Sequence, residues 1–164
     1  MDEPVVTSDS RRVPPEFCQY ADDPCDQTFK DASASTALVL YPSQPTTIAS
    51  TIEAAKDILH RTRRGETWLS WRDLNVTGRI IFCRICEAMR LSETVVADVT
   101  TLNFNLLFEI GYALGLEMPV VPVRDTTYTR DKRVFDDLGL LDTIGYTDFQ
   151  NSEQLATALA STLP

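Results

Sequence analysis

The chain has 164 residues, of which 43% are hydrophobic and 24% charged, and its formal net charge is −9. This length and composition predict one globular domain, and the negative charge disfavours binding to long nucleic acid, whose phosphates it would repel. No apolar run reaches the roughly 18 residues that a membrane-spanning helix needs, and residues 1–10 are too polar for a signal peptide. We therefore expect a cytoplasmic protein without a membrane partner.

Residues 1–35 differ in composition from the rest of the chain. They contain four prolines and many acidic residues, and their apolar residues follow no sustained period. We predict an acidic, proline-containing N-terminal extension over 1–35 and an α/β domain over 36–164. The extension either packs partly ordered against the domain or serves as an interaction arm, and the sequence leaves both readings open.

From residue 36 onward, short apolar runs alternate with segments that repeat apolar residues at helical spacing. Such runs are typical of parallel strands covered on both faces. The predicted strands are 37–41, 68–71, 94–99, 119–123 and, with a weaker apolar signal, 142–146, and the predicted helices begin near residues 46, 79, 105 and 152. This alternation predicts a flavodoxin-like doubly wound parallel sheet of about five strands with helices on both faces.

Ligands of doubly wound sheets bind beyond the carboxyl ends of the strands, so the polar residues that follow each predicted strand are the candidate site. The loops there carry hydroxyl, amide, carboxylate and guanidinium groups, which are the groups that a nucleotide site needs. The candidate substrate-binding residues are Tyr41, Ser43, Arg72, Asp73, Arg79, Asn103 and Asn105, and Asp98 ends the third strand.

Glu109 is the candidate catalytic residue, together with Asp98. If Asn105 is the N-cap of the helix that follows the third predicted strand, Glu109 falls in or just after the first turn of that helix. The helix dipole favours an ionised carboxylate there. Such a carboxylate can attack or stabilise a developing oxocarbenium ion at a sugar anomeric carbon. We expect Gly111 to allow close packing of this helix against a strand.

The segment from Asp98 to Ala113 resembles the signature of the nucleoside 2-deoxyribosyltransferase-like superfamily. In that pattern an aspartate ends a strand, and an Asn-x-Asn is followed by Glu-[Leu/Ile]-Gly-x-Ala at the start of a helix; here these are Asp98, Asn103-Phe104-Asn105 and Glu109-Ile110-Gly111-Tyr112-Ala113. The resemblance implies that Glu109 is the nucleophile and that Tyr41 and Asp73 help to bind a nucleoside.

The second loop and the helix after it resemble TIR domains. The matching residues are Arg72-Asp73, Gly78, Ile81, Ile85, Ala88 and Ser92. TIR-type NAD hydrolases carry their catalytic glutamate on the helix after the third strand, so this resemblance also points to Glu109. Both families share a flavodoxin-like sheet and cleave N-glycosidic bonds.

Two functions remain open at this point. The first is cleavage or transfer at the N-glycosidic bond of a nucleoside, nucleotide or NAD, which would be a substrate rather than a cofactor, with Arg72 or Arg79 at a phosphate and Asp73 or Asn103 at the base or ribose. The second is a non-catalytic nucleotide-binding or TIR-like signalling and assembly module. A homo-oligomer is compatible with both functions.

The cysteines and the single histidine do not indicate a redox or metal function. Cys83 and Cys86 form a Cys-x-x-Cys pair, but they lie in a helical pattern, so we interpret them as core thiols rather than metal ligands. Cys18 and Cys25 fall in the extension. His60 follows a helical pattern beside arginines, and we assign it no catalytic pairing.

Overall fold

The computed structural model describes residues 35–75, 81–101, 103–128 and 145–162. Its strands are β1 (Ser35–Leu40), β2 (Trp68–Ser70), β3 (Ser92–Asp98), β4 (Val120–Asp125) and β5 (Thr147–Phe149). Its helices are α2 (Thr46–Thr62), the 3-10 turn η3 (Trp71–Asp73), α3 (Ile81–Leu91), α4 (Phe104–Gly115) and α6 (Ser152–Thr162). None of the helices in these ranges has the length and apolar character of a membrane span.

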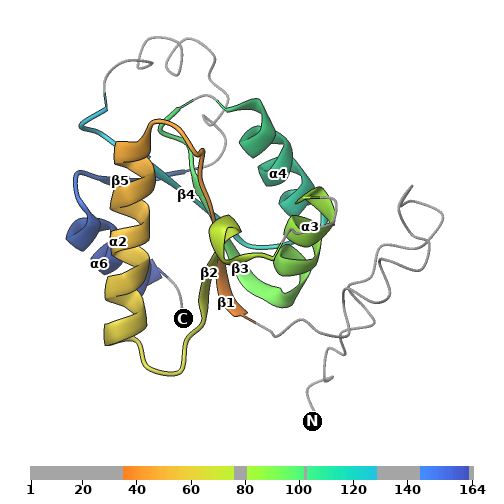
Figure 1. The fold of residues 1–164 in the computed structure, drawn as a ribbon, viewed down its shortest axis with the longest axis horizontal. Coiled ribbons are helices and arrows are strands. Elements are labelled where there is room, and N and C mark those ends of the chain that lie inside the picture. Colours follow the sequence, from red (N-terminus) through yellow and green to blue (C-terminus); the bar gives the residue numbers. More distant parts are fainter. Residues whose placement is uncertain (1–34, 76–80, 102, 129–144, 163–164) are drawn as a thin grey trace, which may run out of the picture.

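The strands form one parallel sheet in the order β2-β1-β3-β4-β5. Helices α2 and α6 cover one face of the sheet, and α3 and α4 cover the other (Figure 1). This is the flavodoxin-like doubly wound arrangement that the alternation of strands and helices predicts.

The two faces of the sheet bury two separate apolar clusters. Alternate residues of one strand point to opposite faces, so Val39 and Val96 pack under α2 and α6, whereas Leu40 and Ala97 pack under α3 and α4. Because both faces are covered, the central strands need apolar residues at nearly every position. This is the reason that the apolar runs in the sequence locate them well.

The predicted fifth strand is wrong in position. Residues 142–144 lie outside the described residues, and Gly145 and Tyr146 precede β5, which is Thr147–Phe149. This strand is short and lies at the sheet edge, and Phe149 is its one buried residue. A single buried side chain leaves no alternating pattern for the sequence to reveal. The first described residue, Ser35, is also the first residue of β1.

Candidate functional site

The reversal of strand order falls between β1 and β3. After β1 the chain proceeds outward to β2, then crosses back over β1 to form β3, which pairs with β1 through Leu38–Val95 and Leu40–Ala97. The loop after β1 leads to α2 on one face, and the loop after β3 leads to α4 on the other. In doubly wound sheets, loops that diverge in this way mark the edge at which ligands bind.

A network of acids around one lysine, the Lys56 network, lies at the ends of β1 and β2. The Lys56 ammonium contacts Glu53 Oε2 at 2.8 Å and Asp73 Oδ2 at 2.6 Å, and it donates to Ser70 Oγ at 3.1 Å. Ser70 Oγ donates to Glu53 at 2.7 Å, and the Tyr41 hydroxyl also donates to Glu53. The sequence-derived candidates Tyr41 and Asp73 are therefore brought together through three residues that were not predicted.

Charges within the Lys56 network stabilise one another. Burial opposes the charge on all three ionised groups, but the hydrogen bonds among them outweigh it, raising the pKa of Lys56 and lowering the pKa of Glu53 and Asp73. Burial and the hydrogen bond to Glu53 raise the pKa of Tyr41 above its usual range. Asp73 thus holds its charge, but Lys56 and Ser70 already occupy one of its oxygens.

An aromatic surface with a cation above it adjoins this network. The rings of Tyr41 and Trp71 are 5.8 Å apart, and the Arg72 guanidinium carbon lies 5.8 Å from the first ring and 5.4 Å from the second. Arg72 is exposed, and the Trp71 Nε1 donor is buried without a hydrogen-bond partner in the described part of the chain. The half-buried Trp71 ring beside this arginine can accept a base and a phosphate, whereas Tyr41 is only 4% exposed.

Asp98 is fully buried at the end of β3. Its Oδ1 accepts hydrogen bonds from the backbone N–H of Thr100, at 3.2 Å, and from the Thr100 hydroxyl. The Thr100 hydroxyl oxygen in turn accepts from the backbone N–H of Asp125 at 2.8 Å. Asp98 therefore ties the loop after β3 to the end of β4.

The second oxygen of Asp98, Oδ2, is buried and has no partner among the described residues. Burial raises the pKa of Asp98 to about 7. The hydrogen bonds from Thr100 offset only part of this effect, and the charge of the nearby Asp125 adds to it. Strand alternation places Asp98 on the same side as Val96, which packs under α2 and α6.

The N-cap of α4 is Asn103 rather than the predicted Asn105. Asn103 Oδ1 accepts from the backbone N–H of Asn105 at 3.0 Å and of Leu106 at 3.2 Å, so it satisfies two of the unpaired donors of the first turn. Asn105 is exposed and lies in the first turn. The Asn-x-Asn spacing offers two capping residues, and the local backbone selects the first.

Glu109 consequently lies in the second turn of α4, beyond the donors of the helix start. The expected effect of the helix dipole is wrong: burial raises the pKa of Glu109 to about 7. The Glu109 side chain is half-buried, and within the described ranges it makes no hydrogen bond or salt bridge. A desolvated carboxyl group with no structural partner is a feature of functional sites.

The flank of α4 that carries Glu109 faces α3. Tyr112 lies about 60° from Glu109 around the helix, and its ring is 5.4 Å from that of Phe82 on α3. Phe108 contacts the same Phe82 ring at 5.4 Å. Glu109 therefore lies between this aromatic contact and the buried stripe of α4. The expected role of Gly111 is wrong, because it is exposed and a side chain there would meet open space.

The structure thus divides the predicted site into groups. Tyr41, Arg72 and Asp73 lie together on the α2 side, Asp98 joins Asp125 through Thr100, and Glu109 lies on the helix layer of the opposite face. Ser43 and Asn105 are exposed, and Arg79 lies outside the described residues. Tyr41, Asp73 and Asp98 end or follow strands at the carboxyl edge, whereas Glu109 lies in the second turn of α4.

Sequence reasoning missed Glu53, Lys56 and Ser70. Lys56 gives the clearest signal that was available, because it falls within the apolar stripe of α2 formed by Ile52, Ala55 and Leu59. A lysine in such a stripe requires a buried partner of opposite charge. Its partners are distant in the sequence, apart from Glu53, so the stripe alone does not identify them.

Cys83, Cys86 and His60 take structural positions, and Cys18 and Cys25 lie outside the described residues. Cys83 and Cys86 are half-buried, and Cys86 Sγ lies 2.9 Å from the Tyr112 hydroxyl. Burial of the hydroxyl and this contact raise the pKa of Tyr112 to about 12. His60 Nε2 lies 2.9 Å from the backbone oxygen of Trp68. In the ranges that the structure describes, no three histidine, cysteine or acidic side chains are grouped to hold a metal.

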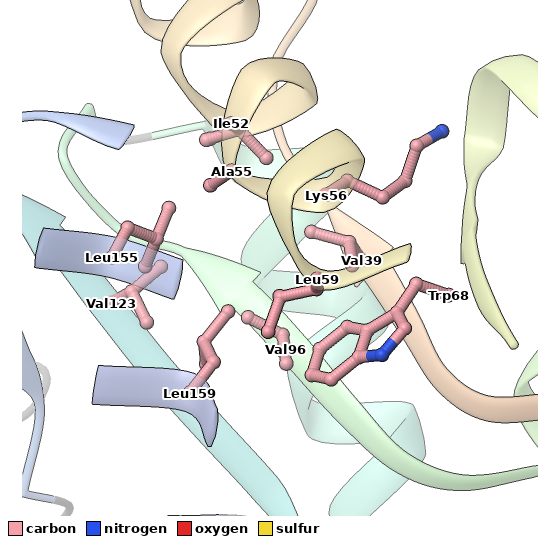
Figure 2. A pocket seen from close by; sticks show the side chains of 10 residues that line it. All are labelled: Val39, Ile52, Ala55, Lys56, Leu59, Trp68, Val96, Val123, Leu155 and Leu159. Atoms are coloured by element: carbon pink, nitrogen blue, oxygen red, sulfur yellow. The ribbon is translucent and has the colours of Figure 1, made fainter. Parts of the chain in front are cut away.

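A small cavity of about 10 Å³ lies away from the carboxyl edge, between α2, α6 and the sheet. Figure 2 shows its apolar lining, with the amine of Lys56 turned away from Leu59, Leu155 and Leu159. This volume is about that of one water-sized probe, so the cavity belongs to the core and cannot hold a nucleotide.

Comparisons with protein-family models, curated proteins and solved structures found no match to this chain. The fold defines a doubly wound α/β protein, a class with many unrelated activities, so its function has to be argued from the residues of the site.

Proposed function

We propose that this protein cleaves or transfers at the N-glycosidic bond of a nucleoside, nucleotide or NAD, with Glu109 acting on the anomeric carbon. The observation that carries this proposal is the Glu109 carboxyl group: it is half-buried, has no partner among the described residues and has a pKa raised to about 7 by burial. Near neutral pH a substantial fraction is ionised, and a poorly solvated carboxylate is a strong nucleophile. The resemblance of Asp98 to Ala113 to nucleoside deoxyribosyltransferases supports the same assignment.

The reaction proceeds by two displacements at the anomeric carbon. The Glu109 carboxylate attacks that carbon, the N-glycosidic bond breaks, and its electron pair leaves with the base. A nucleoside base takes up a proton from water, whereas nicotinamide leaves NAD as a neutral molecule. Water or a second base then attacks the anomeric carbon, the ester bond to Glu109 breaks, and the carboxylate is regenerated; an incoming water or base loses one proton to solvent.

The remaining residues of the edge bind and position the substrate. The exposed Arg72 meets a phosphate, and the half-buried Trp71 beside it meets a base, while the buried Tyr41 supports the Trp71 ring. Asp73 accepts a hydrogen bond from ribose, and the side-chain amide of Asn103 can donate one while its oxygen caps α4. Asp98 acts as a positioning residue, because it fixes the loop that leads from β3 to α4.

Incubation with a substrate panel tests the proposal. The protein is incubated at pH 8 with NAD and, separately, with ribo- and deoxynucleosides and nucleotides, and free base is followed by chromatography. We expect base release from at least one compound, and a loss of about 10³-fold or more in the Glu109→Gln variant.

The matched control is Glu93→Gln, which neutralises an exposed glutamate and should leave the rate unchanged. Folding of every variant is checked by its thermal unfolding curve. Absence of base release from every compound by the folded protein, or equal rates in parent and Glu109→Gln, would refute the catalytic role.

A non-catalytic nucleotide-binding or assembly module is the second candidate. The observation that favours it is the exposure of two phenylalanines, Phe104 and Phe108, on the surface of α4. Binding of a nucleotide that changes the oligomeric state, without release of any base, would support this candidate over the enzyme.

A further inference from the structure

The outer face of α4 is an apolar surface. Phe104 is 84% exposed and Phe108 60%, and Leu114 is also exposed. Gly111 and Gly115 are exposed on the same helix, and a side chain at either position would meet open space. Because a surface helix normally carries polar residues on its outer face, this composition indicates an interaction surface.

Two large residues are followed by two small ones along this face, an order that is complementary to itself in the antiparallel direction. Phe104, Phe108, Gly111 and Gly115 are separated by four, three and four positions, which keeps them on one stripe of the helix. The spacing reads the same in both directions, but the two phenylalanines lie in the first half and the two glycines in the second.

A twofold axis through the middle of the stripe therefore brings large residues against small ones. In an antiparallel pair of α4 helices, Phe104 of one copy would face Gly115 of the other, and Phe108 would face Gly111. A twofold interface requires this type of reciprocity, in which residue i contacts residue j and j contacts i. Glycines also let two helices approach closely, so the rings can fill the space over the partner's backbone.

The charge distribution on α4 allows a second copy as the occupant, and the exposed apolar area is that of a small, weak interface. Glu109 is the only charged residue of α4, and it lies on the flank facing α3, so two chains of net charge −9 can meet here without a charge on either face. The exposed parts of Phe104 and Phe108 amount to about 300 Å² per copy, or about half of the 1,200 Å² that a specific interface buries once both copies are counted. Leu114 and the helix backbone enlarge that area.

We propose that α4 is the interface of a twofold homodimer, in which the phenylalanine half of one helix packs on the glycine half of the other. This interface concerns a different flank of α4 from Glu109 and does not rest on the proposed activity. An interface of this size belongs to the weak, transient class, so we expect the dimer to dissociate on dilution.

Sedimentation velocity over a concentration series tests the proposal. We expect the mass to rise from one chain toward two between about 1 and 100 µM, and the association to tighten with added salt, because salt screens the repulsion between two acidic chains. Gly111→Gln should weaken association at least 10-fold without lowering the unfolding temperature, since its side chain enters open space and helix interiors disfavour glycine. Ile81→Gln, which changes an exposed apolar residue of α3, should have no effect.

The outer pair of the stripe provides a test of the register. Phe104→Gly removes the large residue and Gly115→Phe places two rings against each other, so each single variant should weaken the dimer. The double variant restores one ring opposite one glycine and should recover most of the affinity. A chain that stays monomeric at 100 µM, or a Gly115→Phe variant that associates more strongly than the parent, would overturn the proposal.

Discussion

Two carboxyl groups, Asp98 and Glu109, have a pKa of about 7 chiefly because burial penalises the charged form. They differ in what surrounds them. Asp98 is fully buried and accepts hydrogen bonds from Thr100, whereas Glu109 is half-buried and makes no hydrogen bond with a described residue. The first group therefore serves the structure of the loop, and the second is available for chemistry.

The titration of Asp98 makes stability depend on pH. Its folded pKa of about 7 lies above the reference value of 3.8, so the folded state favours the protonated form. The resulting stability is fully present below pH 4 and is lost as the pH rises through 7. We expect Asp98→Asn to remove this loss, which is on the order of 4 kcal/mol at full burial.

Urea unfolding at pH 5 and at pH 8 measures this effect. The parent should be less stable at pH 8, and Asp98→Asn should show a smaller difference between the two pH values. Glu109→Gln should reduce the difference by less, because solvent screens a half-exposed group. An unchanged pH dependence in Asp98→Asn would show that the carboxyl group is not protonated in the folded state.

At the scale of elements, the start of α4 is where the sequence was least decisive. Asn103 and Asn105 are both good capping residues, and only the backbone geometry shows that Asn103 receives the two hydrogen bonds. The choice moves Glu109 from the edge of the first turn into the second, where burial rather than the dipole sets its pKa. A two-residue error in a helix start thus reverses the expected direction of the pKa shift.

The two asparagines can be separated by experiment. Asn103→Ala should lower the free energy of unfolding by about 1 kcal/mol, because it removes the cap, while Asn105→Ala should change it by less than about 0.5 kcal/mol. Urea titrations of both variants measure this difference. Equal losses in the two variants would contradict the assignment of the cap.

At the scale of the whole molecule, the fold was largely predictable and the side-chain groups were not. The apolar runs of β1, β3 and β4 and the helical stripe of α2 reveal the alternation of strands and helices that predicts the parallel sheet. The Lys56 network depends on contacts between residues 14 and 17 positions apart, and β5 on one buried ring. Pairings of this kind leave no periodic pattern in a single sequence.

The layer of α2 and α6 offers a test of the packing. Leu159 lines the small core cavity (Figure 2), so Leu159→Ala should enlarge it and lower the free energy of unfolding by about 2–5 kcal/mol. Thr157→Ala, on the exposed side of α6, should change it by no more than about 0.5 kcal/mol. A loss below 1 kcal/mol for Leu159→Ala would mean that α6 is not packed on the sheet as described.

The pH dependence of base release tests the central claim most directly. If ionised Glu109 is the nucleophile, the rate should rise about tenfold per pH unit below its pKa of about 7 and level off above it, and Glu109→Gln should be inactive throughout. Activity would then increase over the same pH range in which stability falls. Base release that persists in Glu109→Gln, or that declines as the pH rises through 7, would contradict the assignment.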